Sequence, residues 1–174
     1  MNREKQLKIA PEFMYIEYSK YELYDKLHDD FFSVLDALYD AYPELHVKRL
    51  GLRYIDNIEI PNENPFDWNN YLRPELYSIL NLADDKKTIS RAFHVLEFNY
   101  GDYLLRFQFG MFNPDHPAPI KKKSYILDHD MYIMKILEKS EIEKTLNLFH
   151  DKAITSFEEV IKDDLRKIME PINE

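Results

Sequence analysis

Arginine and aspartate side chains in this chain are spaced so that β-strands would gather them on one face of a sheet. Arg49 and Arg53 lie four residues apart in the run RLGLRYIDNIEIP, and Asp128 and Asp130 lie two apart in the run LDHD. Residues an even number apart share a face of a strand. A carboxylate pair of this kind can hold a metal ion, and paired guanidinium groups can bind phosphate or carboxylate anions.

The same charges could instead neutralise one another across the sheet. Arg106 would join the two arginines from a neighbouring strand. A metal ion would need further ligands, for which Glu97 and His94 are candidates, whereas His129 would point to the opposite face. Because cross-strand ion pairs are common and resemble binding sites, we favour structural ion pairing over a metal site and over an anion site.

A second candidate is the surface loop NPDHPAPIKKK, residues 113–123, which carries Asp115 and His116. Loops on a rigid scaffold often carry recognition, and prolines lower the entropy cost of holding a loop in one shape. A histidine there could titrate near neutral pH, but no nucleophile accompanies it. We favour an ordinary rigid crossover between strands over a recognition loop. The pair His150-Asp151 lacks the all-helical frame of metal phosphohydrolases, so we do not assign it that chemistry.

The elements that would position these residues are mostly strands. Residues 46–60 alternate between an apolar face, which Asp56 interrupts, and a face with arginines. Residues 88–99 and 103–112 flank the pair Gly101-Asp102, which predicts an antiparallel hairpin. Two further strands are predicted at 13–18 and 124–134.

Two long helices are predicted from apolar spacings of three and four residues. The first, of about 22 residues, follows Ser19, where Ser19 and Glu22 fit a capping box, and it ends at Pro43. The second, of about 28 residues, opens with the box-like run Ser140 to Glu143. Short helical turns are predicted at Pro65 and Pro74. We therefore expect one α+β domain spanning residues 1–174, a mainly antiparallel sheet of about five strands with both long helices on one face.

Composition excludes several classes of protein. The chain has 174 residues, 45% of them hydrophobic, with a net charge of −9 and no cysteine. It therefore has no disulfide, no thiolate nucleophile and no cysteine-ligated zinc. Its 3 glycines lie too far apart for a phosphate-binding loop. The acidic charge disfavours nucleic acid, and we expect the run Lys121 to Lys123 to be a solvated loop end. No apolar stretch predicts a membrane span or signal peptide, so we expect a cytoplasmic protein without a membrane partner.

The whole chain resembles, in order, a sporadically distributed bacterial family of uncharacterised proteins marked by an RLGLRYIN-like strand. The matching stretches are RLGLRYID at 49–56, DWNNYL at 67–72, FGMFNPDHPAPI at 109–120, LDHD at 127–130 and FH…FEEVIKDDLRKIM at 149–169. Asp56 replaces an asparagine typical of that family. Members of the family are longer at the start, so the resemblance implies a short or N-terminally trimmed member. The family brings no activity, cofactor or site residue to transfer.

No catalytic spacing is present, so we predict a non-catalytic domain that binds another protein or itself, with no cofactor and no resident metal. The high aromatic content and the expected sheet edge favour contact surfaces. By analogy with the sporadic family, a role in a mobile or defence-type bacterial system would fit. The alternative is an enzyme, or a binder of a small anion or metal ion, that uses the charged sheet face.

Overall fold

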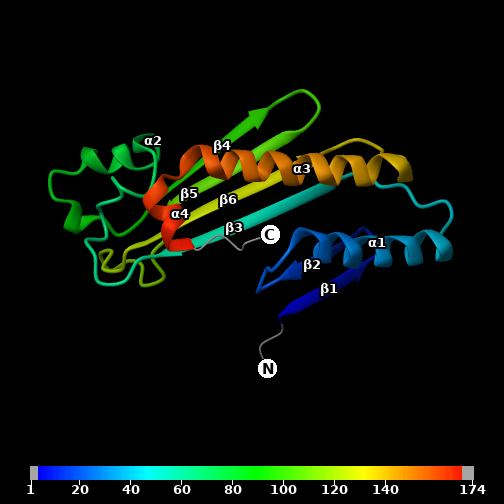
Figure 1. Ribbon diagram of the computed structural model, residues 1–174, viewed down its shortest axis with the longest axis horizontal. Coiled ribbons are helices and arrows are strands. Elements are labelled where there is room, and N and C mark those ends of the chain that lie inside the picture. Colours follow the sequence, from blue (N-terminus) through cyan, green and yellow to red (C-terminus); the bar gives the residue numbers. More distant parts are fainter. Residues whose placement is uncertain (1–3, 170–174) are drawn as a thin grey trace. The chain divides into compact units, whose positions relative to one another are not determined.

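The computed structural model describes residues 4–169, and the chain divides into two compact units, Met1–His46 and Val47–Glu174. The described residues form an α+β fold, with strands in two separate antiparallel sheets (Figure 1). One sheet has two strands and belongs to the first unit, and the other has four strands and belongs to the second. No helix in the described range is long and apolar enough to cross a bilayer.

The first unit contains a β-hairpin and one long helix. Strands β1 (Lys5–Ala10) and β2 (Phe13–Tyr18) pair antiparallel, and helix α1 (Tyr24–Ala41) follows. The Asp30 carboxylate on α1 accepts hydrogen bonds from the Tyr18 hydroxyl and the Lys5 ammonium. Burial, together with the bond to Asp30, raises the pKa of Tyr18 to about 12. These contacts tie the helix to both strands.

The helix in this unit starts later than its sequence pattern predicts. Leu23 occupies the N-cap position in an extended conformation, with no side-chain cap. The predicted box of Ser19 and Glu22 is therefore wrong, and Glu22 instead accepts a hydrogen bond from Lys26 at 3.1 Å. The strand at 13–18 is confirmed, and its neighbour β1 was not predicted.

The second unit is built on a four-stranded antiparallel sheet in the order β3-β6-β5-β4. Its strands are β3 (Leu50–Glu59), β4 (Ala92–Asn99), β5 (Leu104–Met111) and β6 (Ser124–Ile133). The predicted hairpin of β4 and β5 is confirmed, with Gly101 at φ 85° in its turn, a value that glycine adopts without strain. The sheet has four strands instead of about five because β2 pairs with β1.

Helix α3 (Lys139–Val160) packs on the apolar face of the sheet over β3 and β6. Figure 1 shows it crossing the strands in orange. Its buried stripe repeats at helical spacing and consists of Ile142, Leu146, Phe149 and Ala153. The facing strand residues are buried too, among them Leu52, Leu105, Phe107, Leu127 and Met131. The core therefore lies between one helix and one sheet face.

Both ends of α3 differ from the sequence prediction. The capping box is formed by Glu138 and Glu141, two residues before the predicted one. The helix ends at Val160, because Ile161 bridges to Leu72 in the segment after β3. A separate short helix, α4 (Asp163–Met169), follows, so the predicted single helix of about 28 residues is interrupted.

The segment between β3 and β4 is anchored by Trp68. Trp68 is fully buried, and its indole N–H donates to the carbonyl oxygen of Pro65 at 2.9 Å. Helix α2 (Pro74–Tyr77) and two 3₁₀ turns, Ser78–Leu82 and Lys86–Thr88, complete the segment.

Candidate functional site

The strand register places the predicted arginines and aspartates on the sheet face opposite α3. Asp130 of β6 lies between Arg53 of β3 and Arg106 of β5. Asp128, two residues earlier, lies between Ile55 and Gln108. Cross-strand neighbours share a face, so one row of side chains carries both arginines with an aspartate between them.

Asp128 is the most completely paired group on this face. The Nε and Nη2 atoms of Arg53 donate to its two carboxylate oxygens at 2.8 and 2.6 Å. The Gln108 amide nitrogen donates to Oδ2 at 3.0 Å. The fork of Arg53 thus covers a carboxylate that is only 3% exposed, while the guanidinium itself stays half in solvent. Bidentate pairing of this kind is the stronger form of ion pair.

Asp130 and the two outer arginines are paired more loosely. The Arg49 Nη2 atom lies 3.7 Å from Asp130, and its guanidinium stacks over the Tyr132 ring at 4.9 Å. The Arg106 Nε atom lies 3.7 Å from the Glu97 carboxylate. Burial raises the pKa of Asp130, and the neighbouring arginines, Arg49 foremost, oppose that rise. The three arginines therefore have Asp128, Asp130 and Glu97 as their carboxylate neighbours.

The ligands considered for a metal ion are not brought together. Glu97 leans on Arg106, and His94 lies on the opposite face, where its strand partner is Phe109. Across residues 4–169, no group of three or more histidine, aspartate or glutamate side chains is arranged to hold a metal ion. The two aspartates act as ion-pair partners in this arrangement.

The loop with Asp115 and His116 is held in shape by Asn113. The Asn113 side-chain amide donates to the carbonyl oxygens of Ser90 at 2.8 Å and Ala118 at 2.7 Å. Its Oδ1 atom accepts from the Asp115 backbone N–H at 3.2 Å. Asp115 and His116 themselves are exposed. These hydrogen bonds hold the loop in one shape, as a rigid crossover requires. They do not place another reactive side chain beside Asp115 or His116.

Two titratable groups lie on the apolar face, where the strand parity places them. His129 is 1% exposed and stacks on Phe107 at 4.4 Å between ring centroids, and no described residue hydrogen-bonds to either ring nitrogen. Burial lowers its pKa to about 4. Asp56 interrupts the apolar face as its spacing predicts. Burial raises its pKa to about 6, with a further contribution from Asp128.

A polar contact between side chains joins the sheet to α3. The Tyr54 hydroxyl and the His150 Nδ1 atom are 2.9 Å apart, within hydrogen-bonding distance. His150 is thus a partner of a strand tyrosine at the border of the helix stripe. No spacing in the sequence could pair residues 96 positions apart.

Lys123 is buried, so the prediction of a solvated loop end is wrong for this residue. It is 4% exposed, and its Nζ atom donates to the Glu63 carboxylate at 2.6 Å. The same ammonium lies 5.2 Å from the ring centre of Trp68 and 4.6 Å from that of Tyr71. A carboxylate and two aromatic faces therefore replace the water that this cation loses.

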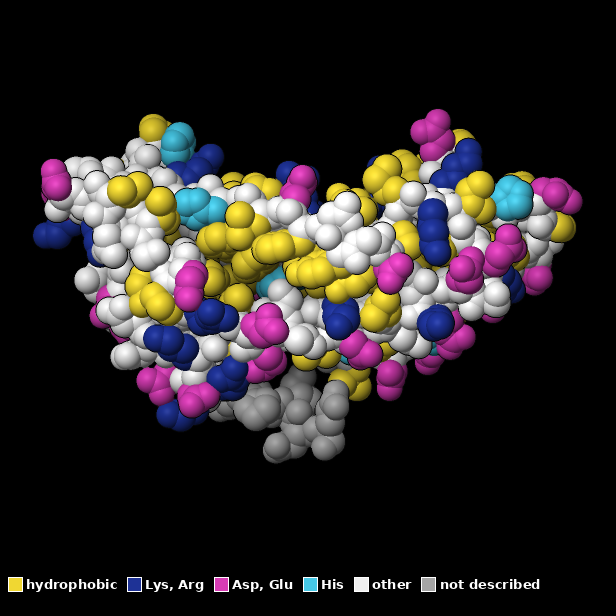
Figure 2. All heavy atoms as spheres, turned by 90° about the horizontal axis from the view of Figure 1, so that it is seen from above, with side chains coloured by type: hydrophobic (Ala, Val, Ile, Leu, Met, Phe, Trp, Pro, Cys, Tyr) yellow, Lys and Arg dark blue, Asp and Glu magenta, His cyan; other side chains and the backbone are white. Residues whose placement is uncertain are grey.

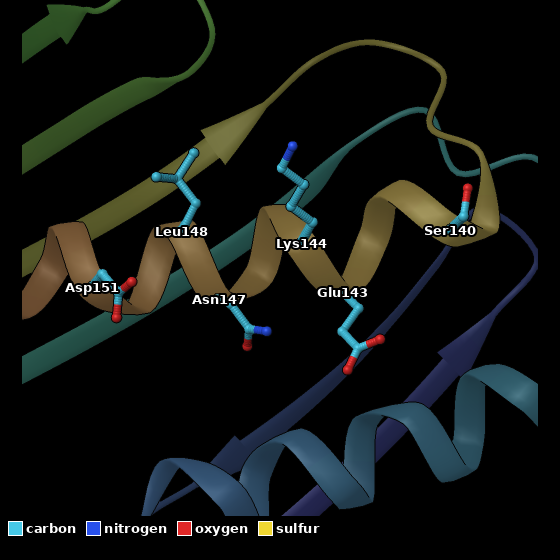
Figure 3. Close-up of a pocket in the computed structure, with 6 residues that line it drawn as sticks. All are labelled: Ser140, Glu143, Lys144, Asn147, Leu148 and Asp151. Carbon is cyan, nitrogen blue, oxygen red and sulfur yellow. The ribbon is translucent and has the colours of Figure 1, made fainter.

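A shallow hollow lies on the outer surface of α3. Its lining residues all come from that one helix: Ser140, Glu143, Lys144, Asn147, Leu148 and Asp151. Their side chains spread to both sides of the helix and do not converge on a common point (Figure 3). A ligand site needs converging polar groups around a concave, mostly apolar space, and this hollow lacks them.

Comparisons with protein-family models, curated proteins and solved structures found no match to this chain. The resemblance to the bacterial family marked by the RLGLRYIN-like strand therefore stays a prediction.

Proposed function

We propose that this chain is a non-catalytic interaction domain that binds another protein or a second copy of itself, in a bacterial cytoplasm. The observation that carries the proposal is the closed pairing of Arg53 with Asp128. The two groups best suited to ligand chemistry on the sheet satisfy each other through two short hydrogen bonds. A catalytic or metal-binding carboxylate would instead face an open cavity.

Apolar exposure on the strands supports the same proposal. Ile55 on β3 is 57% exposed and Val95 on β4 is 47% exposed, and both lie on the charged face. Next to paired charges, such side chains make the mixed surface that protein interfaces use. By analogy with the resembling family, a mobile or defence-type bacterial system would supply the partner.

The second candidate function is binding of a small anion on the charged face. Its support is the loose pairing of Arg49 and Arg106, whose nearest carboxylate contacts are both 3.7 Å long. That distance is outside hydrogen-bonding range, so their N–H donors could turn to a phosphate or carboxylate.

A thermal-shift screen with divalent metal ions, inorganic phosphate and nucleotides separates the two candidates. The interaction domain predicts no reproducible rise in melting temperature with any of them. A rise of several degrees with phosphate that Arg49→Gln abolishes, or with a metal ion that Asp128→Asn abolishes, would establish the small-ligand function instead. Arg73→Gln, at an exposed ion pair with Glu75 outside the strands of the sheet, is the matched control.

A further inference from the structure

The outer edge of β4 has backbone N–H and C=O groups that pair with no other strand in the described residues. β4 is the last strand of its sheet and pairs only with β5 among the strands of the second unit. The Tyr100 N–H donates to the Tyr103 carbonyl oxygen at 3.0 Å. Backbone groups alternate in direction along a strand, so those of Phe98, Leu96 and His94 point to β5 as well. The N–H and C=O groups that point to the open edge are therefore those of Phe93, Val95, Glu97 and Asn99.

Side chains on both faces of β4 are apolar and exposed. Val95 on the charged face is nearly half exposed, and so is Leu96 (48%) on the other, beyond the strands that α3 covers. Figure 2 is seen from above, the side on which β4 lies in Figure 1, and shows hydrophobic side chains gathered in the middle of the view. An exposed, apolar edge strand is a template for pairing with another strand.

The opposite edge of the sheet, β3, carries charged residues that disfavour pairing with another strand, and β4 has few of them. β3 carries Arg53, Asp56 and Glu59 along its length. β4 contains a single charged residue, Glu97, and it has no proline, lysine or glycine that would block a neighbour. Natural sheets use such residues to prevent edge pairing.

We propose that two copies of this chain pair through β4, antiparallel about a twofold axis at Val95, so that the two sheets join into one. This inference rests on the proposed interaction function and names its partner as a second copy. In this register Leu96 of one copy faces His94 of the other, and Phe98 faces Ala92. The pairing covers the whole strand and satisfies the outward-pointing N–H and C=O groups of both edges.

The charges on β4 disfavour an axis at Leu96 or at Glu97, whereas an axis at His94 would pair fewer residues within the strand. An axis at Leu96 would place the two Glu97 side chains on diagonal positions, and an axis at Glu97 would set them directly opposite, where like charges repel. The axis at Val95 separates them by four residues, about 13 Å. It also brings Arg91 of each copy, whose Nε atom donates to the Phe112 carbonyl oxygen of its own chain at 3.1 Å, diagonal to Glu97 of the other copy, where opposite charges attract.

Sedimentation equilibrium over a range of concentrations tests the pairing. The full chain is expected to form a dimer with a dissociation constant on the order of micromolar, since one strand edge is a small interface. Val95→Lys sets two lysines against each other at the axis and is expected to weaken the dimer about a hundredfold. Ile55→Lys is the matched control, because it places the same charge on an exposed position of β3. A chain that stays monomeric, or a dimer that Val95→Lys leaves unchanged, would overturn the proposal.

Disulfide trapping tests the register, because the natural chain has no cysteine. At a twofold axis, Val95→Cys would bring two Cα atoms to about 5.5 Å, within disulfide range. Under mild oxidation this variant is expected to form a covalent dimer quickly, whereas Glu97→Cys remains mostly monomeric. Faster trapping by the Glu97 variant would overturn the proposed axis.

The two proposals fail in different ways. A monomeric chain without small-ligand binding would reject self-pairing and leave a heterologous partner. A small ligand bound by the charged face would reject the interaction function itself, whatever the oligomeric state.

Discussion

Arg53 and Asp128 form a bidentate ion pair across two neighbouring strands, with bonds of 2.8 and 2.6 Å. The carboxylate is buried and the guanidinium covers it from the solvent side. This arrangement makes the pair a structural element of the sheet face. Because both oxygens of Asp128 accept hydrogen bonds from Arg53 or Gln108, this carboxylate is not available to a ligand.

His129 should make the protein sensitive to acid. Its pKa is lowered from 6.5 to about 4 by burial, so between these values the unfolded state binds more protons than the folded state. Stability should therefore rise with pH across that window and be lost as the pH falls toward 4. His129→Leu is expected to remove about 2–3 kcal/mol of this pH dependence, with little change at pH 7. Urea unfolding at several pH values measures it.

The exposed His116 provides the control for that experiment. His116→Gln removes an imidazole from the surface instead of the core and is measured in the same way. An unchanged acid sensitivity in His129→Leu would contradict the assignment to the buried imidazole.

Asp56 should act in the opposite direction. Burial raises its pKa from 3.8 to about 6, so between these values the folded state binds more protons than the unfolded state. Ionised Asp56 therefore destabilises the fold as the pH rises through 6. Asp56→Asn is expected to stabilise the protein at pH 7.5 by about 1–3 kcal/mol, and to give no gain below pH 4. A loss of stability at pH 7.5 on this substitution would show that the carboxylate has a favourable partner.

Much of the fold could be predicted because the strands alternate in polarity. The run from Leu50 to Glu59 shows two distinct faces, and the parity of Asp128 and Asp130 places them beside the arginines without knowledge of the tertiary structure. β1 was missed because its residues are nearly all exposed, and a strand without a buried face leaves no pattern. The start of α3 was misplaced because two capping-box spacings overlap there. Glu138 caps the helix in place of Ser140.

The missed site residues all depend on contacts between distant parts of the chain. Lys123 reads as one of three loop lysines, yet it is buried because Glu63 and the rings of Trp68 and Tyr71 surround it. The closeness of Tyr54 and His150 likewise exists only once α3 lies on the sheet. Local spacing carries no information on such pairs.

The pairing of Lys123 with Glu63 should matter more than an ordinary surface ion pair. Glu63→Gln leaves a buried ammonium without its carboxylate and is expected to lower the midpoint of urea unfolding. Lys123→Met keeps the apolar contacts with Trp68 and Tyr71 and returns Glu63 to water, so it should be better tolerated. Glu75→Gln, at the exposed pair with Arg73, should leave the midpoint unchanged. Equal midpoints for Glu63→Gln and Glu75→Gln would contradict this role.

A double-mutant cycle on Arg53 and Asp128 tests most directly whether the charged face is structural. The free energy of unfolding is measured for the natural chain, Arg53→Met, Asp128→Asn and the double variant. We predict that each single variant is destabilised, Arg53→Met by about 2 kcal/mol, and that the pair couples by about 1–3 kcal/mol. Single variants that are as stable as the natural chain or more stable, with no coupling, would contradict the account, because residues kept for a ligand commonly cost stability in its absence.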